Sequence, residues 1–200
     1  MGEGGPARAT PLTIIGGYLG AGKTTLVNHL LRSADGLRLA VLVNEFGELP
    51  IDRDLIEGRD GNVISIAGGC VCCSYGNDLV MTLQEMAAGK ARFDHVLLEA
   101  SGVGIPSAIA ATVSLMGAYT LDGVVVVADA ETIEASARDR YMGETVIAQL
   151  AEADLVVLNK LDLVDEAARD RVEGWLGEVA LGARVVTATR AALPPAVVLE

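Results

Sequence analysis

The 200-residue sequence has little of three things: basic charge, long apolar runs and aromatic side chains. Its 15 basic residues against 27 acidic ones give a net charge of −12, which disfavours broad contact with nucleic acid or an anionic membrane. No apolar run approaches the ~18 residues that a membrane-spanning helix needs. Scarce aromatics beside abundant Gly, Ala and Val suit a twisted parallel sheet covered by helices. We therefore expect neither nucleic acid nor a membrane as a partner.

Cysteine and histidine are also rare, and their placement is informative. All three cysteines fall within residues 70–73, an odd and tightly clustered set that does not describe a disulfide framework. A reducing cytoplasm is the expected location. The two histidines, His29 and His95, are expected to be structural rather than ligands. Residues 1–11 are rich in Gly and Pro without a signal-peptide apolar core, so we expect a flexible leader.

The remaining chain, 12–200, has the length and the 51% hydrophobic content of one large domain with a sizeable core. Strand-like apolar runs alternate with helical patterns, and polar or acidic residues follow several of these runs. In open α/β sheets the carboxyl ends of the strands are where ligands bind. The expected strands are Leu12–Gly16, Leu39–Val43, Asn62–Ala67, His95–Leu98, Leu121–Ala128, Asp154–Leu158 and Arg184–Thr187, and the expected helices are Lys23–Leu31, Asp78–Ala88 and Asp165–Glu178.

A phosphate-binding loop follows the first strand. Residues 17–24, GYLGAGKT, match G-x-x-x-x-G-K-[ST] with a strand before and a helix after. The glycines let successive backbone N–H groups face a phosphate, Lys23 reaches the β and γ oxygens, and the Thr24 hydroxyl holds Mg²⁺. This predicts a P-loop NTPase, a three-layer α/β/α sandwich with a mostly parallel sheet. The expected nucleotide-binding residues of the loop are Gly17, Gly20, Ala21, Gly22, Lys23, Thr24 and Thr25.

The tetrapeptide 159–162, NKLD, follows the Asp154–Leu158 strand and indicates the base. The Asp162 carboxylate can accept from the N1–H and the exocyclic amine of guanine, while Asn159 and the Lys160 stem support the ring. Adenine offers no such pair of donors, so an adenine nucleotide would leave a buried carboxylate unpaired. GTP, hydrolysed to GDP, is the expected nucleotide.

Glu99 ends the His95–Leu98 strand and is a candidate to hold Mg²⁺ or to orient the attacking water. Gly102 lets its backbone approach the γ-phosphate, so its segment can sense hydrolysis. The alternative for Glu99 is a capping carboxylate for the helix near Ile105. Asp52, with the loop 44–48, is a second candidate switch, for which a solvated turn is an equal alternative.

The cysteine cluster supplies two or three soft ligands of the kind that Zn²⁺ and Co²⁺ prefer. Cys70 and Cys72 project to one side of an extended segment, and Gly68-Gly69 permits a turn that brings in Cys73. A further ligand is expected from Glu45, Glu48, water or another chain. An incomplete set suits a site that releases its ion. Small buried hydrophobes, a structural partial site and a redox-active pair remain as alternatives.

Taken together, these segments resemble the CobW-type metallochaperone GTPases, relatives of the hydrogenase and urease nickel-insertion GTPases. The resemblance covers nearly the whole chain in one consistent order. Its motifs are 16–25 (GGYLGAGKTT), 43–48 (VNEFGE) with Ile51-Asp52, 68–73 (GGCVCC), 99–103 (EASGV), 127–130 (VADA) and 158–163 (LNKLDL).

The resemblance implies a cytosolic GTPase whose GTP·Mg²⁺-bound form presents the cysteine site to Zn²⁺ or Co²⁺. It implies that Asp52 and Glu99 belong to two switch segments and act with Lys23 in hydrolysis. Release would then be to the apo-form of a client metalloprotein, and a nucleotide- or metal-dependent homodimer stays open. We expect slow intrinsic turnover, because no arginine finger is identifiable; Arg53 is a speculative candidate.

Two departures from the family pattern accompany the resemblance. Pro50 stands in the first switch, where it fixes φ and removes an N–H. Family members usually continue into a C-terminal domain, which we expect this chain to lack. The alternative function is a GTP-dependent conformational switch in which the cysteines form a structural metal site or a redox sensor.

Overall fold

The computed structural model describes residues 9–33, 36–44, 63–66, 77–89 and 93–199. Its centre is a seven-stranded sheet with the order β3-β2-β4-β1-β5-β6-β7, in which every neighbouring pair is parallel. The strands are β1 (Thr10–Gly16), β2 (Leu39–Asn44), β3 (Val63–Ile66), β4 (His95–Glu99), β5 (Tyr119–Asp129), β6 (Leu155–Asn159) and β7 (Arg184–Thr187).

The central strands are buried on both faces, as a parallel sheet covered by helices requires. All five residues of β4 and of β6 are buried, and so are the last five of β1. These strands are short apolar runs without inward and outward alternation, so both faces of each strand contribute to the core. The sequence prediction of a buried parallel sheet is confirmed.

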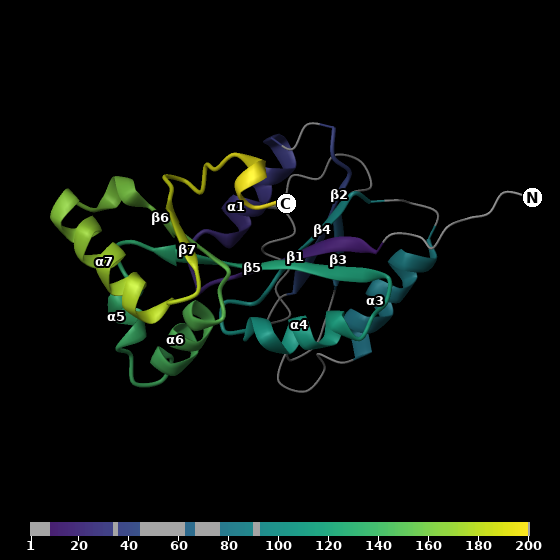
Figure 1. Cartoon of the computed structure of the whole chain (residues 1–200), viewed down its shortest axis with the longest axis horizontal. Coiled ribbons are helices and arrows are strands. Elements are labelled where there is room, and N and C mark those ends of the chain that lie inside the picture. Colours follow the sequence, from purple (N-terminus) through teal and green to yellow (C-terminus); the bar gives the residue numbers. More distant parts are fainter. Residues whose placement is uncertain (1–8, 34–35, 45–62, 67–76, 90–92, 200) are drawn as a thin grey trace, which may run out of the picture.

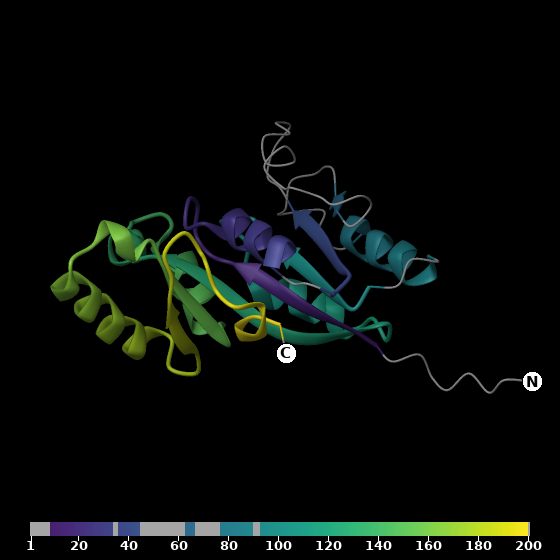
Figure 2. The same ribbon diagram turned by 90° about the horizontal axis from the view of Figure 1, so that it is seen from above.

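Helices lie on both sides of this sheet, which makes three layers (Figures 1 and 2). On one face α1 packs with the C-terminal segment 188–199, through Leu26, Leu30 and Leu193. The opposite core draws residues from α3 to α7. The helices are α1 (Lys23–Ser33), α3 (Asn77–Ala88), α4 (Pro106–Ser114), α5 (Ile133–Ala137), α6 (Gly143–Ala151) and α7 (Glu166–Val179), with short 3-10 turns η2 (Leu161–Leu163) and η3 (Pro195–Val197). The α/β/α class predicted for the chain is therefore observed.

The boundaries differ from the sequence expectation in several places. β1 begins at Thr10, two residues before the expected start, and β5 begins at Tyr119 rather than Leu121. Helix α7 begins one residue late because Asp165 is its N-cap, with a side chain that accepts from Ala168 N at 2.8 Å. Helix α4 was anticipated only as a helix near Ile105, without bounds. Helices α5 and α6 were not predicted, because with five and nine residues they have too few turns for a clear apolar period.

The strand topology brings the predicted ligand-binding segments to one edge. The phosphate loop follows β1, Glu99 ends β4, Asp129 ends β5 and Asn159 ends β6. These strands are adjacent in the sheet, so their carboxyl ends converge. Among the described residues, no helix combines the length and the apolar character needed to cross a membrane.

Candidate nucleotide-binding site

The phosphate loop has backbone angles that only glycine adopts readily. Gly17, Gly20 and Gly22 have φ values of 128°, 75° and 108°. A Cβ on Gly17 would overlap the Val127 carbonyl, and one on Gly22 would lie 2.5 Å from Asn159 Nδ2. Gly20 has open space around it. Positive φ therefore constrains all three glycines, and close packing constrains the first and the last.

Lys23 begins α1 and is nearly buried, with 8% of its surface exposed. Its ammonium donates to the carbonyls of Gly17 at 2.9 Å and Tyr18 at 3.4 Å, so the side chain lies back over its own loop. The positive end of an 11-residue helix and this ammonium thus stand at the same point. The next two residues, Thr24 and Thr25, continue the first turn, and Thr25 is exposed.

Thr24 and Glu99 meet across 75 positions of sequence. Thr24 Oγ1 donates to Glu99 Oε1 at 2.8 Å, and the carboxylate is buried at 6% exposure. The backbone beside Glu99 is fixed, because the next residue stays paired with β1: Ala100 N donates to Ile15 O. A hydroxyl and a carboxylate side by side are the hard oxygen donors that Mg²⁺ takes, so the residues present fit that ion. Helix α4 has Ile105 at its N-cap without a side-chain cap bond, and the carboxylate observed at its first turn is Glu152, which accepts from Ser107 N at 2.9 Å.

Gly102 lies directly against the phosphate loop. A Cβ there would come within 2.5 Å of Leu19 Cδ2 and 3.0 Å of Leu19 N. The segment after β4 thus touches the loop that follows β1, as expected for a segment that senses the nucleotide. Gln149 of α6 donates to the carbonyls of Gly102 and Gly104, a contact that sequence reasoning missed.

Asn159 connects the phosphate loop with the segment after β7. It is 2% exposed; its Nδ2 donates to Ala21 O at 2.9 Å, and its Oδ1 accepts from Ala191 N at 2.7 Å. Both ends of the amide thus bond to main chain. Asn159 therefore links the phosphate loop to the segment after β7.

The other two residues of the motif are more open. Lys160 has a left-handed φ of 62°, and its ammonium donates to Asp129 Oδ2 at 2.8 Å. Asp162 is exposed on the turn η2. Of the three predicted base-binding residues, only Asp162 is exposed.

Two further parts of this site were not predicted as site residues, although the sequence motif 127–130 includes the first of them. Asp129 pairs with Lys160, and residues 188–191 pack beside β6, where Ala188 N donates to Leu158 O. The position of Asp129 at a strand end was a usable signal. For residues 188–191 the sequence carries little signal. Arg190 and Ala191 have positive φ, which neither residue type predicts.

The remaining predicted residues lie outside the described ranges. These are the cysteines and the two acidic switch residues: Cys70, Cys72, Cys73, Glu45 and Asp52. Across the ranges that the structure covers, no group of three His, Cys, Asp or Glu side chains forms a metal-binding cluster.

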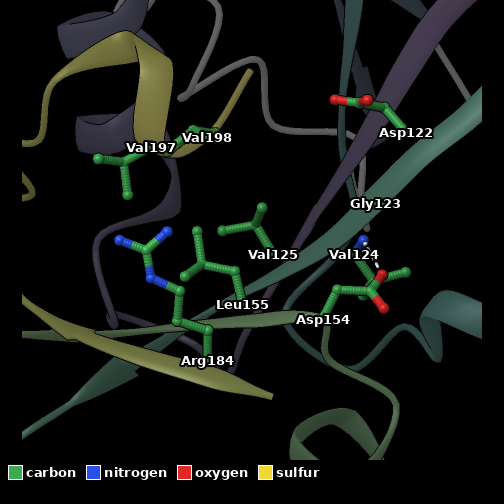
Figure 3. A pocket seen from close by; sticks show the side chains of 9 residues that line it. All are labelled: Asp122, Gly123, Val124, Val125, Asp154, Leu155, Arg184, Val197 and Val198. Carbon is green, nitrogen blue, oxygen red and sulfur yellow. Dashed lines mark hydrogen bonds between the residues drawn. The ribbon is translucent and has the colours of Figure 1, made fainter. Parts of the chain in front are cut away.

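A pocket of about 330 Å³ lies at the other end of the strands, between the starts of β6 and β7 (Figure 3). Its wall includes Asp154, Leu155 and Arg184, and Asp154 Oδ2 accepts from Val124 N at 2.8 Å. None of the predicted nucleotide-binding residues lines it. The pocket is therefore separate from the phosphate loop.

The histidines have structural partners, as expected. His29 Nε2 lies 2.8 Å from Leu193 O, which ties α1 to the C-terminal segment. His95 Nε2 lies 2.7 Å from Thr13 Oγ1, and Thr13 donates to Asp122 Oδ2 at 3.2 Å. Burial lowers the pKa of His95, and the Asp122 carboxylate partly opposes that shift.

Comparison with known families identifies a match over most of the chain. Residues 11–187 match the family described as CobW/HypB/UreG, nucleotide-binding domain. A protein named zinc chaperone CobW, from Pseudomonas aeruginosa, is 34% identical over 221 residues, covering 94% of this chain and 59% of its own length. One named zinc chaperone YjiA, from Escherichia coli, is 35% identical over 188 residues, covering 89% of this chain and 57% of its own.

Solved structures agree with the sequence relatives. The Zn(II)-bound YjiA GTPase of E. coli superposes with a TM-score of 0.67 at 26% identity, covering 90% of this chain and 57% of that one. The hydrogenase maturation factor HypB of Archaeoglobus fulgidus shares the fold, with a TM-score of 0.62 at 17% identity over 90% of this chain and 81% of that one. The chain thus spans a little under three fifths of the sequence relatives it matches.

Proposed function

The chain belongs to the CobW/HypB/UreG family, and on that premise we propose that it is a GTP-hydrolysing metallochaperone. Residues 12–200 act as one GTPase domain that binds GTP with Mg²⁺ and hydrolyses it to GDP and phosphate. Nucleotide state controls the binding of Zn²⁺ or Co²⁺ at Cys70, Cys72 and Cys73, with Glu45 as a further ligand. The ion is the cargo, and a client apoprotein receives it.

The observation that carries the nucleotide half is the bond between Thr24 Oγ1 and Glu99 Oε1, 2.8 Å long, beside the phosphate loop. A chance glycine-rich turn has no reason to align a threonine with a buried carboxylate 75 residues away. The Lys23 ammonium and the start of α1 lie at the same sheet edge. This arrangement supplies positive charge for phosphate and hard oxygen donors for Mg²⁺.

Hydrolysis follows from the same groups. Lys23 leaves the Gly17 and Tyr18 carbonyls and neutralises the β and γ oxygens as negative charge develops on them. Thr24 and Glu99 would hold Mg²⁺, which would supply positive charge to the phosphate oxygens when bound. Gly102 offers backbone close to Leu19 at the γ-phosphate end, and Asp52 contributes from the first switch. Because the sequence identifies no arginine finger, we expect slow turnover.

Base specificity is assigned to Asp162. Its exposed carboxylate accepts from the N1–H and the exocyclic amine of guanine, while Asn159 stabilises the loops beneath the base. Asp162→Asn replaces an acceptor by a group that also donates. We expect GTP affinity to fall on the order of a hundredfold or more while xanthosine triphosphate gains affinity. Unchanged GTP binding in this variant would contradict the assignment.

The metal half of the proposal rests on the cysteine spacing together with the family. Relatives that match this chain are named zinc chaperones, and one is named a zinc-regulated GTPase metalloprotein activator. Three thiolates leave a coordination position for exchange, which a closed four-ligand site does not. The proposed setting is a reducing cytoplasm, which keeps the thiols available, and a nucleotide- or metal-dependent homodimer is part of the proposal.

Chelator challenge separates transfer from a structural clasp. With a transfer site, a competing chelator removes Zn²⁺ or Co²⁺ quickly and the fold survives, as followed by circular dichroism. Unfolding in step with metal loss would instead favour a structural site. Mass mapping of a Cys72–Cys73 disulfide under mild oxidation would favour the redox sensor.

A further inference from the structure

The C-terminal turn of α6 holds the segment after β4 at two places. Gln149 Nε2 donates to the carbonyls of Gly102 at 3.2 Å and Gly104 at 2.8 Å. Three residues later, Glu152 accepts from the backbone N–H and the hydroxyl of Ser107, both at 2.9 Å. Positions three apart share one side of a helix. One helix end therefore binds successive parts of a single segment, residues 102–107.

The two contacts have different surroundings. Gln149 is 1% exposed, so its amide reaches the two carbonyls inside the protein. Without that donor, each carbonyl would need another partner in a place where water has little access. The pair between Glu152 and Ser107 lies at the surface, where water can replace only part of the interaction. Gln149 is the stronger restraint of the two.

The restrained segment is the one that touches the phosphate loop. Gly102 packs on Leu19 so closely that a Cβ would fall 3.0 Å from Leu19 N. Its turn is fixed from within as well, since Gly104 N donates to Ser101 O at 2.9 Å. With Gln149 on one side and Leu19 on the other, Gly102 has little room to shift.

We propose that Gln149 is a positioning residue for GTP hydrolysis, holding residues 102–104 against the phosphate loop so that they meet the γ-phosphate in one fixed place. This rests on the proposed GTPase function of the same site. Helix α6 leads within three residues into β6, which ends at Asn159. The helix that holds residues 102–104 is therefore joined directly to the strand that carries the predicted base-binding loop.

The test measures kcat and KM for GTP in Gln149→Met, which keeps the side-chain length and removes both donated bonds. We expect kcat to fall about tenfold with KM within about twofold, the size of effect that follows from losing roughly one net hydrogen bond. Gln84→Met is the matched control, because Gln84 is the only other glutamine and is exposed on α3. Its kcat should equal that of the wild type.

A second variant gives a readout that loss of packing cannot produce. Gln149→Glu presents only acceptors to the two carbonyls when ionised, and regains one donor when protonated. Its kcat relative to wild type should rise as the pH falls through the carboxyl titration, whereas that of Gln149→Met should show no such rise. Glu152→Ala, a surface change that leaves the fold intact, should lower kcat about threefold.

Several results would overturn the proposal. One is a kcat of Gln149→Met equal to that of the wild type. Another is a kcat of Gln149→Glu, relative to wild type, that does not change with pH. If Gln149 variants fail to fold, an unchanged kcat in Glu152→Ala overturns it. A wild-type protein that binds GTP but never hydrolyses it overturns the proposed function as well, so the two failures are distinguishable.

Discussion

Individual residues at the phosphate loop differ in what fixes them. Gly22 has both a φ of 108° and a close neighbour, Asn159 Nδ2, whereas Gly20 has a φ of 75° and open space. The motif G-x-x-x-x-G-K-[ST] requires Gly22 and leaves position 20 variable, but it does not show what constrains either glycine. The distinction depends on Asn159, which lies 137 positions further along the chain than Gly22, and only the folded structure brings the two together.

Gly22→Ala should therefore weaken guanine nucleotide binding on the order of a hundredfold, because left-handed strain adds to an overlap with the Asn159 amide. Gly20→Ala is the matched control and should cost about tenfold or less, since only strain applies. Fluorescent GDP titration compares the two. Equal losses in both variants would contradict the packing argument.

At the scale of elements, neighbouring strands are tied by side chains as well as by backbone. Thr13 of β1, His95 of β4 and Asp122 of β5 form a chain of contacts at the sheet end away from the phosphate loop. The single hydroxyl hydrogen of Thr13 goes to Asp122, so His95 Nε2 carries a hydrogen and donates to Thr13. Burial lowers the pKa of His95 and so favours the neutral ring, with its hydrogen on Nε2.

This chain of contacts predicts a pH dependence of stability. Burial lowers the folded-state pKa of His95 below its ordinary value of about 6.5, so the unfolded chain takes up the proton first as the pH falls. The contribution of neutral His95 to the free energy of unfolding is fully present above about pH 6.5. It is lost as the pH drops towards the pKa of His95 in the folded protein. In urea denaturation, wild type should lose more unfolding free energy than His95→Gln between pH 7 and 5. If the unfolding free energies of the two proteins fell equally between pH 7 and 5, the lowered pKa of His95 would be contradicted.

Sequence patterns predicted the elements unevenly, for physical reasons. All seven strands and three helices were expected within about two residues of where they lie, because buried parallel strands are continuous apolar runs and α1, α3 and α7 have three or four turns. Helix α4 was anticipated only as a helix near Ile105, whereas the short helices α5 and α6 were missed, and with them Gln149. The fold class and the phosphate loop were predictable; the bond between Gln149 and the 102–104 segment was not, because a buried glutamine has no sequence signature.

At the scale of the whole molecule, the sheet brings four distant segments to one edge. The phosphate loop, Glu99, Asp129 and Asn159 follow four adjacent strands, with the Gln149 contact supporting the segment after Glu99. The strand β3 precedes the cysteine segment and pairs with β2, which precedes the first switch. A change at the first switch could thus reach the cysteines through the hydrogen-bonded pair of β2 and the edge strand β3. Coupling of this kind is reciprocal. If GTP raises the affinity of the cysteine site for metal, bound metal must raise the affinity for GTP by the same factor.

The most direct test of this coupling is an equilibrium titration of the reduced protein with Zn²⁺ and with Co²⁺, loaded in turn with GTP·Mg²⁺ and GDP·Mg²⁺. A slowly hydrolysed GTP analogue keeps the first state constant, and Cys70→Ser with Cys72→Ser controls for adventitious sites while leaving guanine nucleotide binding intact. We predict affinities that differ by about tenfold or more between the two nucleotide states, the usual scale of allosteric coupling. Identical Zn²⁺ and Co²⁺ affinities in both states would contradict the account.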